Sequence, residues 1–197
     1  MRRKIDSEHL SERLIEAAET MLVETQGRRL VLSELAARVG ISQSYAHRFF
    51  PTKADLVRAL AARWFAHVEA GSAEAVGSDL PAAERLELWV LTILRIKRRR
   101  YDENPALFDA YLDLAADHMD LVGEHTDRLS ADLRSILSEL VAPERLDAVL
   151  VAVEDATLLF RTPLNISRYR RRATDERATA VVRMIVGHLD SVSASSA

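Results

Sequence analysis

The side chains best suited to chemistry lie close together in the segment GISQSYAHRFFPTKADL, residues 40–56. Helical spacing over residues 43–50 places Ala46 and Phe49 on one inward face. The opposite face carries hydrogen-bonding groups, namely Gln43, Ser44, Tyr45, His47 and Arg48. Glutamine can pair with adenine, and arginine with guanine or phosphate, when a helix enters the major groove of DNA. The pattern indicates a DNA-reading surface, and the alternative is a solvated face on a core helix.

Such a surface needs a helix-turn-helix to hold it, and the preceding residues fit that motif. Two short helices are expected at 33–39 and 43–50, with small Ala36 where they cross. Gly40 suits a turn residue with positive φ, because glycine adopts that conformation without a Cβ clash. Ser42 is predicted to N-cap the second helix and Ser33 the first.

Composition indicates a globular, all-α protein. Apolar residues make up 48% of the 197 residues, whereas glycine and proline number only 6 and 5. Helical periodicity covers nearly the whole chain, and no segment alternates as a strand would. Cysteine is absent, and no apolar run approaches the roughly 20 residues that span a bilayer. We therefore expect a cytoplasmic protein with no disulfide bonds and no membrane partner.

About nine helices are expected, in two parts. Residues 1–52 form the predicted three-helix DNA-binding domain, and residues 53–197 form a C-terminal helical bundle, with helix 53–70 as the connection. The segment 86–96 is apolar on more than one face, which predicts a helix at the centre of the bundle. The last two helices, expected at 144–168 and 174–191, present broad apolar faces suited to a homodimer contact.

Charge is distributed unevenly along the chain. The formal net charge is −3, yet residues 1–68 hold 11 Lys and Arg against 8 Asp and Glu, a balance of +3. The basic runs at 95–100 (RIKRRR) and 168–172 (RYRRR) are interpreted as solvated helix ends. This distribution suits a phosphate-binding N-terminal part, although ordinary scatter of surface charge is an equal alternative.

The segment LSELAARVGISQSYAHRFFPTKADLVRAL, residues 32–60, resembles the DNA-binding part of the TetR/AcrR family of bacterial transcriptional regulators. The resemblance covers roughly residues 8–65. It implies that Lys53 contacts a DNA phosphate at the start of the fourth helix, and that the C-terminal bundle encloses a small-molecule pocket.

Three positions of the reading helix depart from the family pattern. His47 stands where a phosphate-contacting tyrosine is usual, Ala46 replaces a branched apolar residue, and Tyr45 replaces a small threonine. A tyrosine at position 45 could take over the phosphate or base contact. The predicted DNA-contacting residues are Ser33, Gln43, Ser44, Tyr45, His47, Arg48 and Lys53.

Candidate residues for the ligand pocket combine aromatic and polar side chains on the central helices. The aromatic residues are equally typical of an ordinary hydrophobic core. Glu154 interrupts an apolar helix and needs a hydrogen-bonding partner or a solvent-exposed face. The set is Trp89, Phe108, Tyr111, His118, Glu154 and Arg161.

No catalytic or metal-binding pattern stands out. His118 and His125 are seven residues apart, which is less persuasive than adjacent-turn spacing. Neither a nucleophile elbow nor a glycine-rich phosphate loop is present. We therefore expect no catalytic residues, no metal and no cofactor.

The sequence thus predicts a ligand-responsive, homodimeric repressor that binds a pseudo-palindromic operator in double-stranded DNA and a small-molecule effector. A transcriptional activator of the same fold would share every feature. A helical small-molecule-binding protein without DNA binding is a further alternative, given His47 and Ala46. An all-helical enzyme is the remotest.

Overall fold

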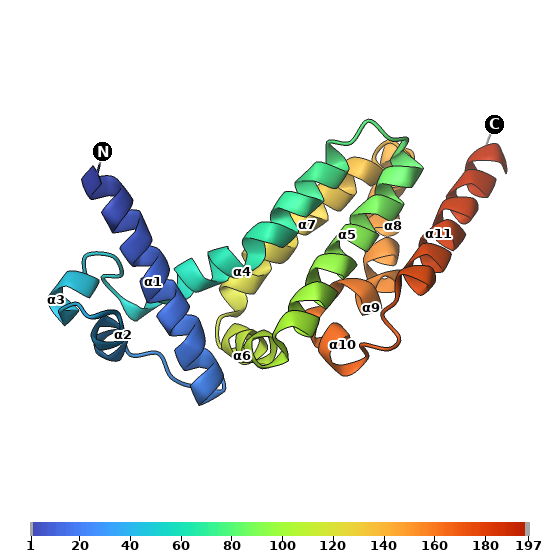
Figure 1. Ribbon diagram of the computed structural model, residues 1–197. Coiled ribbons are helices and arrows are strands. Elements are labelled where there is room, and N and C mark those ends of the chain that lie inside the picture. The colour runs from blue at the N-terminus through green and yellow to red at the C-terminus, as the bar shows by residue number, and fades with distance from the viewer. Residues whose placement is uncertain (1, 196–197) are drawn as a thin grey trace. The chain divides into compact units, whose positions relative to one another are not determined.

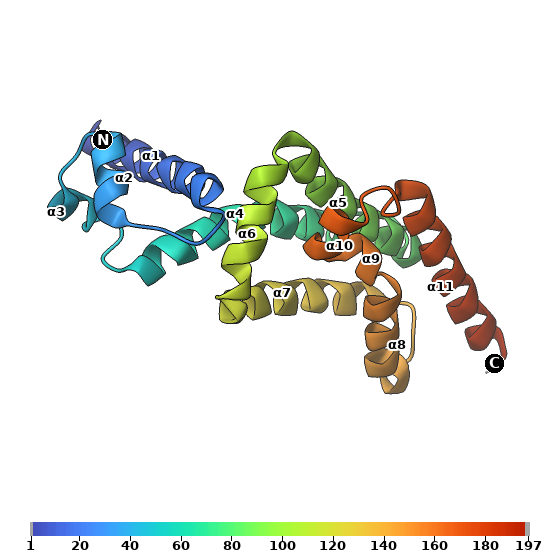
Figure 2. The same cartoon turned by 90° about the horizontal axis from the view of Figure 1, so that it is seen from below.

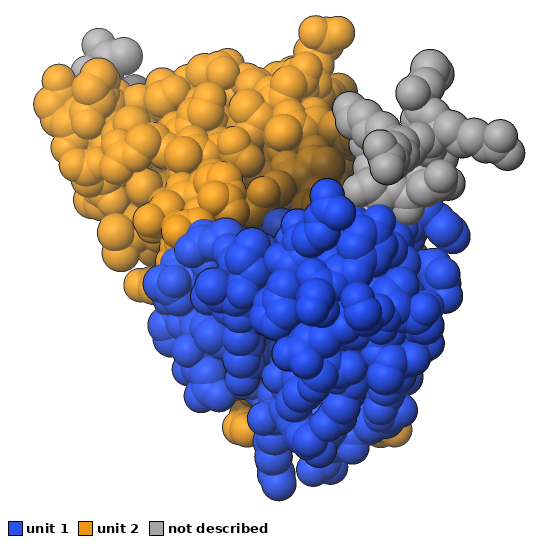
Figure 3. All heavy atoms as spheres, turned by 90° about the vertical axis from the view of Figure 1, so that its left-hand side faces the viewer, with its two compact units in different colours: residues 1–65, 104–121 blue, residues 66–103, 122–197 orange. Residues whose placement is uncertain are grey.

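The computed structural model describes residues 2–195, with the side chains of residues 9–191. This described part contains eleven helices and no strand (Figure 1), which confirms the all-α prediction. None of these helices is long and apolar enough to cross a membrane. The helices divide into two compact units, coloured separately in Figure 3.

Unit 1 comprises residues 1–65 and 104–121. Its core is built from apolar side chains one helical turn apart, such as Leu14, Ala18 and Leu22 on the first helix, which are all fully buried. They pack with Leu35 and Leu60 in one cluster. The helices that contribute are α1 (Arg2–Thr25), α2 (Leu32–Val39), α3 (Gln43–Ala46), the first part of α4 (Lys53–Val76), and α6 (Pro105–Ala116).

Unit 2 comprises residues 66–103 and 122–197, and helix α5 (Ala82–Glu103) is its centre. Leu86, Trp89 and Ile93 of α5 have no exposed surface, as expected for a helix that is apolar on several faces. Helices α9, α10 and α11 all pack against α5, as Figure 2 shows from below. The other helices are α7 (Met119–Leu137), α8 (Pro143–Ala156), α9 (Leu158–Arg161), α10 (Pro163–Arg168) and α11 (Asp175–Ser195).

The segment expected as one helix at 144–168 is three helices in the structure. The first break is at Thr157, which is completely buried and whose hydroxyl donates to the Val153 carbonyl at 2.7 Å. The second break precedes Pro163, which has no N–H and cannot continue a helix from Arg161. These breaks raise the helix number from the expected nine to eleven among the described residues.

The turn between α2 and α3 has the conformation that the sequence predicts. Gly40 follows α2 with φ 79° and ψ 32°, in the left-handed region. Its N–H donates to the Ala37 carbonyl at 3.2 Å, and the Ile41 N–H donates to the Ala36 carbonyl at 2.9 Å. A left-handed residue thus ends α2 and redirects the chain into α3.

Replacing Gly40 by alanine should lower the free energy of unfolding by about 1 kcal/mol, because a Cβ is disfavoured in the left-handed region. A Cβ there would meet no atom within 4 Å, so the cost is conformational rather than steric. Chemical denaturation of the variant measures the change.

The matched control is Gly123→Ala inside α7, where a Cβ also meets no atom within 4 Å and φ is not positive. Alanine is favoured over glycine in a helix interior, so this variant should gain about 0.5–1 kcal/mol. Equal effects of the two substitutions would contradict the role assigned to the turn.

Candidate nucleic-acid interface

The predicted reading residues all lie on the exposed side of α3 and the turn after it. Gln43, Ser44, His47 and Arg48 are exposed, and Tyr45 keeps 40% of its surface accessible. Ala46 has no exposed surface, so it holds α3 against the core as expected. The helix is shorter than predicted, because it ends at Ala46 instead of residue 50.

Two phenylalanines, and not one, hold the segment to the core. Phe49 was expected to point inward, but it is only partly buried, whereas Phe50 is 5% exposed and belongs to the unit 1 core. Residues 47–49 form a turn, which shifts the inward position by one residue relative to a continuous helix. Phe49 packs against this core as expected, and Phe50 is the more deeply buried of the two.

The two predicted N-caps differ in outcome. The Ser42 hydroxyl accepts a hydrogen bond from the Tyr45 N–H at 3.2 Å, which confirms it as the cap of α3. The prediction for Ser33 is wrong, because α2 begins at Leu32 with Val31 as its N-cap and no side-chain bond. The Val31 carbonyl accepts the Glu34 N–H at 3.1 Å, so Ser33 lies inside the first turn with an exposed side chain.

His47 is held by hydrogen bonds within the segment. Its Nδ1 lies 3.3 Å from the Pro51 carbonyl oxygen, which can only accept, so Nδ1 carries the proton. The other nitrogen, Nε2, then accepts from the Gln43 amide Nε2 at 3.4 Å. His47 therefore orients the Gln43 side chain through its amide nitrogen.

Tyr45 organises the remaining side chains of the reading surface. Its ring meets the ring of Phe49 edge to face, with 5.5 Å between centroids and an interplanar angle of 84°. The guanidinium of Arg48 lies over the Tyr45 ring at 5.5 Å. The Tyr45 ring thus contacts both the Arg48 guanidinium and the Phe49 ring. These contacts limit the positions that Arg48 adopts before any contact with a nucleic acid.

Helix α4 begins with a reciprocal capping arrangement that the sequence prediction missed. The Thr52 hydroxyl accepts the Asp55 N–H at 3.1 Å, and the Asp55 carboxylate accepts the Thr52 N–H at 2.9 Å. The T-x-x-D spacing of TKAD was the available signal. This cap fixes Lys53 as the first residue of α4, with an exposed side chain.

Two arginines tie α2 to α1. Arg13 donates through Nη2 to the Val39 carbonyl at 3.2 Å, which satisfies one of the free carbonyls at the end of α2. Arg38 binds both carboxylate oxygens of Glu24, at 3.1 and 2.5 Å. These bonds lower the pKa of the Glu24 carboxyl. Both contacts steady the helix from which the turn at Gly40 departs.

Three of the predicted pocket residues belong to unit 1. Phe108 and Tyr111 are buried in contact with Trp64, whose ring stacks on Tyr111 at 4.1 Å. The Tyr111 hydroxyl donates to the Glu19 carboxylate at 2.9 Å. His118 is partly buried in the break between α6 and α7. In the structure the two aromatic residues are core residues.

The other three predicted pocket residues belong to unit 2, where Trp89 and Arg161 contact each other. The guanidinium of Arg161 lies 5.4 Å from the centre of the Trp89 ring. Trp89 Nε1 donates to the buried Ser72 hydroxyl at 2.7 Å. Arg161 Nη2 donates to the backbone carbonyl of Glu154 at 3.0 Å, and the Glu154 side chain is partly buried.

The basic run 95–100 is only partly solvated. Lys97 is 7% exposed, so the prediction of a solvated helix end is wrong for this residue. Lys97 lies one turn beyond Ile93 and two beyond Trp89, and the same face of α5 is buried at all three positions. The four-residue spacing of Trp89, Ile93 and Lys97 in the sequence was the available signal that Lys97 lies on the buried face.

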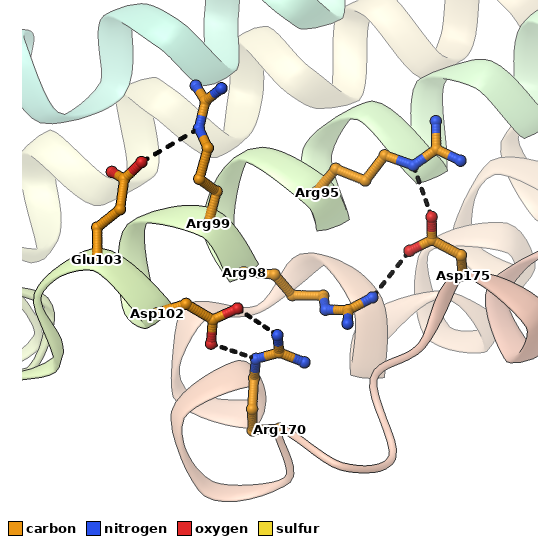
Figure 4. A pocket seen from close by; sticks show the side chains of 7 residues that line it. All are labelled: Arg95, Arg98, Arg99, Asp102, Glu103, Arg170 and Asp175. Carbon is orange, nitrogen blue, oxygen red and sulfur yellow. Dashed lines mark hydrogen bonds and ion pairs between the residues drawn. The ribbon is translucent and has the colours of Figure 1, made fainter.

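The arginines of this run line a hollow of about 410 Å³, shown in Figure 4. Arg95 and Arg98 both bind the Asp175 carboxylate, at 2.6 and 2.9 Å, and Arg170 binds Asp102 through two nitrogens. The hollow is thus an ion-paired surface that joins α5 to the start of α11. The full lining is Arg95, Arg98, Arg99, Asp102, Glu103, Arg170 and Asp175.

Removing the Asp55 carboxylate should weaken the start of α4. We expect Asp55→Ala to lower the free energy of unfolding by about 1 kcal/mol, because the Thr52 N–H loses its acceptor. Glu84→Ala in the first turn of α5 is the control, since Glu84 is an exposed acid at a helix start. It should cost only about 0.3 kcal/mol through the helix dipole. Equal losses by chemical denaturation would contradict the capping role.

Comparison with known proteins identifies the family. Residues 82–182 match the family model described as "Tetracyclin repressor-like, C-terminal domain". The fold is similar to that of the TetR family regulator PfmR from Thermus thermophilus, with a TM-score of 0.58 and 19% identity over 88% of this chain and 94% of that one.

A second solved structure that matches this chain is the TetR-like regulator LfrR from Mycobacterium smegmatis in complex with proflavine. The TM-score is 0.47, with 17% identity over 94% of this chain and 97% of that one. No curated protein matches the chain. Because the family model spans half of its length, the chain belongs to the TetR family of transcriptional regulators.

Proposed function

We propose that this protein is a ligand-responsive, homodimeric repressor that binds a pseudo-palindromic operator in the cytoplasm. The observation that carries the proposal is the exposed face of α3 and the turn after it, where Gln43, Tyr45 and Arg48 are exposed and Ala46 and Phe50 are buried. Side chains of this kind on a docked helix read base edges in the major groove.

Within this proposal the predicted contacts take separate roles. Gln43 and Arg48 read bases, and Ser44 and Tyr45 complete the contact surface. Lys53 binds a phosphate at the capped start of α4, where its charge and the free N–H groups of the helix act together. Ser33 supplies a hydroxyl from the exposed first turn of α2.

His47 acts in this proposal by holding Gln43, because both of its ring nitrogens already have partners in the segment. That role replaces the phosphate contact that a tyrosine makes at this position in the family pattern. The alternative of a helical small-molecule-binding protein without DNA binding, which rests on His47 and Ala46, predicts no saturable operator binding. Ala46 is fully buried and fits its place beneath α3.

The proposed homodimer forms through α8 and α11. The exposed surface of α8 includes Val151, 57% exposed, and Leu158, the first residue of α9, is 50% exposed. On α11 Met184 is 71% exposed, with Ala180 and Gly187 on the same face one turn away. Exposed apolar faces on two helices suit isologous packing into a four-helix contact, which aligns two reading heads with a two-fold operator.

We assign DNA binding to residues 1–52, and effector binding and dimerisation to residues 53–197, with the helix from residue 53 to 70 as the connection. An effector bound in the bundle shifts operator affinity if it binds the two states of the protein differently. An activator of the same fold remains the alternative, and the position of the operator relative to the promoter distinguishes the two.

Binding to a short DNA fragment from the protein's own promoter region should be saturable and should weaken steeply with salt. Arg48→Ala should relax the sequence preference, with a loss of about 1–3 kcal/mol on the best site. Lys53→Ala should weaken binding to all sequences alike and reduce the salt slope by about 1. Fluorescence anisotropy at several salt concentrations measures these changes.

The matched control is Arg134→Ala, which removes an exposed cation from α7 in unit 2. Its affinity and salt slope should equal those of the parent. Absence of saturable binding, or parent-like binding by both the Arg48 and Lys53 variants, would overturn the DNA-reading assignment.

Met184→Glu should convert the dimer to a monomer, because the two-fold contact would bring like charges together in an apolar interface. Sedimentation velocity measures the molecular mass. Leu80→Glu is the control, since Leu80 is 42% exposed but lies between α4 and α5. A Met184→Glu protein that stays dimeric would refute this interface.

A further inference from the structure

Two buried cations lie next to each other inside unit 2. Lys97 of α5 is 7% exposed, and its Nζ donates to the backbone carbonyl of Arg161 at 2.5 Å. Arg161, at the end of α9, is itself partly buried with its guanidinium over the ring of Trp89. Side chains with these charges are almost never buried unless they are paired.

The partners of both cations are neutral. Among the described residues, the Arg161 carbonyl is the one hydrogen-bond acceptor of Lys97, although an ammonium has three donors. Arg161 donates to the Thr157 hydroxyl at 2.8 Å and to the Glu154 backbone carbonyl at 3.0 Å. Within the described part of the chain, no carboxylate forms an ion pair with either cation.

The acidic side chains that face this region are already engaged. Glu69 of α4 binds His125 and Arg128, both at 2.8 Å, and Asp132 of α7 accepts the Ser72 hydroxyl at 2.5 Å. The charge of Glu154 acts on Arg161 only at longer range. Among the described residues, neither Lys97 nor Arg161 therefore has a carboxylate as a hydrogen-bond partner.

Burial changes the ionisation of these groups. It lowers the pKa of Lys97 to about 7, with the charges of Arg161 and Arg100 adding to the effect, and it lowers the pKa of Arg161 as well. Burial also lowers the pKa of His125 to about 4, so His125 is neutral at pH 7 and adds no charge. An anion beside Lys97 would favour its charged form.

Apolar side chains pack beside the two cations, together with the Thr157 hydroxyl that accepts a hydrogen bond from Arg161. Trp89 and Ile93 precede Lys97 on the same face of α5, and neither has exposed surface. Phe160, next to Arg161 in the chain, is 2% exposed. Beside two cations and mainly apolar side chains, the favoured ligand is a molecule with an apolar body and a single anionic end.

We propose that the effector of this regulator is a carboxylate with an apolar body, and that its carboxylate binds between Lys97 Nζ and the Arg161 guanidinium. The inference rests on the ligand response proposed above and adds the chemical class of the ligand. The hollow at Arg98 is a weaker candidate, because its arginines are already paired with Asp102, Glu103 and Asp175.

Benzoate is the first probe, with benzamide and benzylamine as neutral and cationic molecules of the same shape. Thermal unfolding of the full chain without DNA should show a saturable rise of the midpoint with benzoate and none with the other two. The Lys97 ammonium, followed by NMR, should titrate near pH 7 in the free protein and at higher pH with benzoate bound.

Lys97→Met keeps the length of the side chain and removes its charge. We expect benzoate affinity to fall at least about tenfold, because a buried partner of the anion is lost. Without ligand the midpoint should rise by about 3 °C, since a buried unpaired charge has been replaced by an apolar group. Arg99→Met is the matched control on the same helix, where Arg99 is 65% exposed, and it should bind benzoate as the parent does.

Absence of benzoate binding, equal stabilisation by benzamide, or unchanged benzoate affinity in Lys97→Met would each overturn the inference. Because these measurements contain no DNA, they separate the two proposals. Benzoate binding without operator binding would refute the proposed repressor function but support the anion site. Operator binding without benzoate binding would refute only the anion site.

Discussion

The left-handed turn at Gly40 is the constraint on which the reading surface depends. It ends α2 and sets the direction of α3, and the contacts around it make that direction unique. Arg13 binds the last carbonyl of α2, Ser42 caps α3, and Ala46 is fully buried against the core. A helix of four residues has little stability of its own, so this frame of tertiary contacts maintains it.

The surface that results is ordered before any nucleic acid binds. His47 positions Gln43, and Tyr45 lies between Arg48 and Phe49. Side chains that are already restrained lose less conformational entropy on binding, so more of the contact energy appears as affinity. The unusual residues of this helix therefore compensate one another, and the family pattern is replaced by a different set of internal contacts.

Much of this could be predicted from the sequence because the signals are local. Helical periodicity, the glycine of the turn and the serine cap each act within a few residues. The burial of Lys97 could not be predicted from the sequence, because a run of charged residues is typical of a solvated helix end. Lys97 is buried because α9 packs against α5. Similarly, the interior place of Phe50 depends on where α3 ends, and the assignment of Tyr111 and Trp89 to different units depends on how the chain divides.

The breaks that divide residues 143–168 have a consequence for the chemistry of the interior. A continuous helix uses nearly all of its carbonyl oxygens internally, whereas every helix end releases several. Here the released oxygens of Glu154 and Arg161 accept the buried guanidinium and ammonium. The backbone thus supplies hydrogen-bond acceptors to both buried side chains, a role that acidic side chains commonly have.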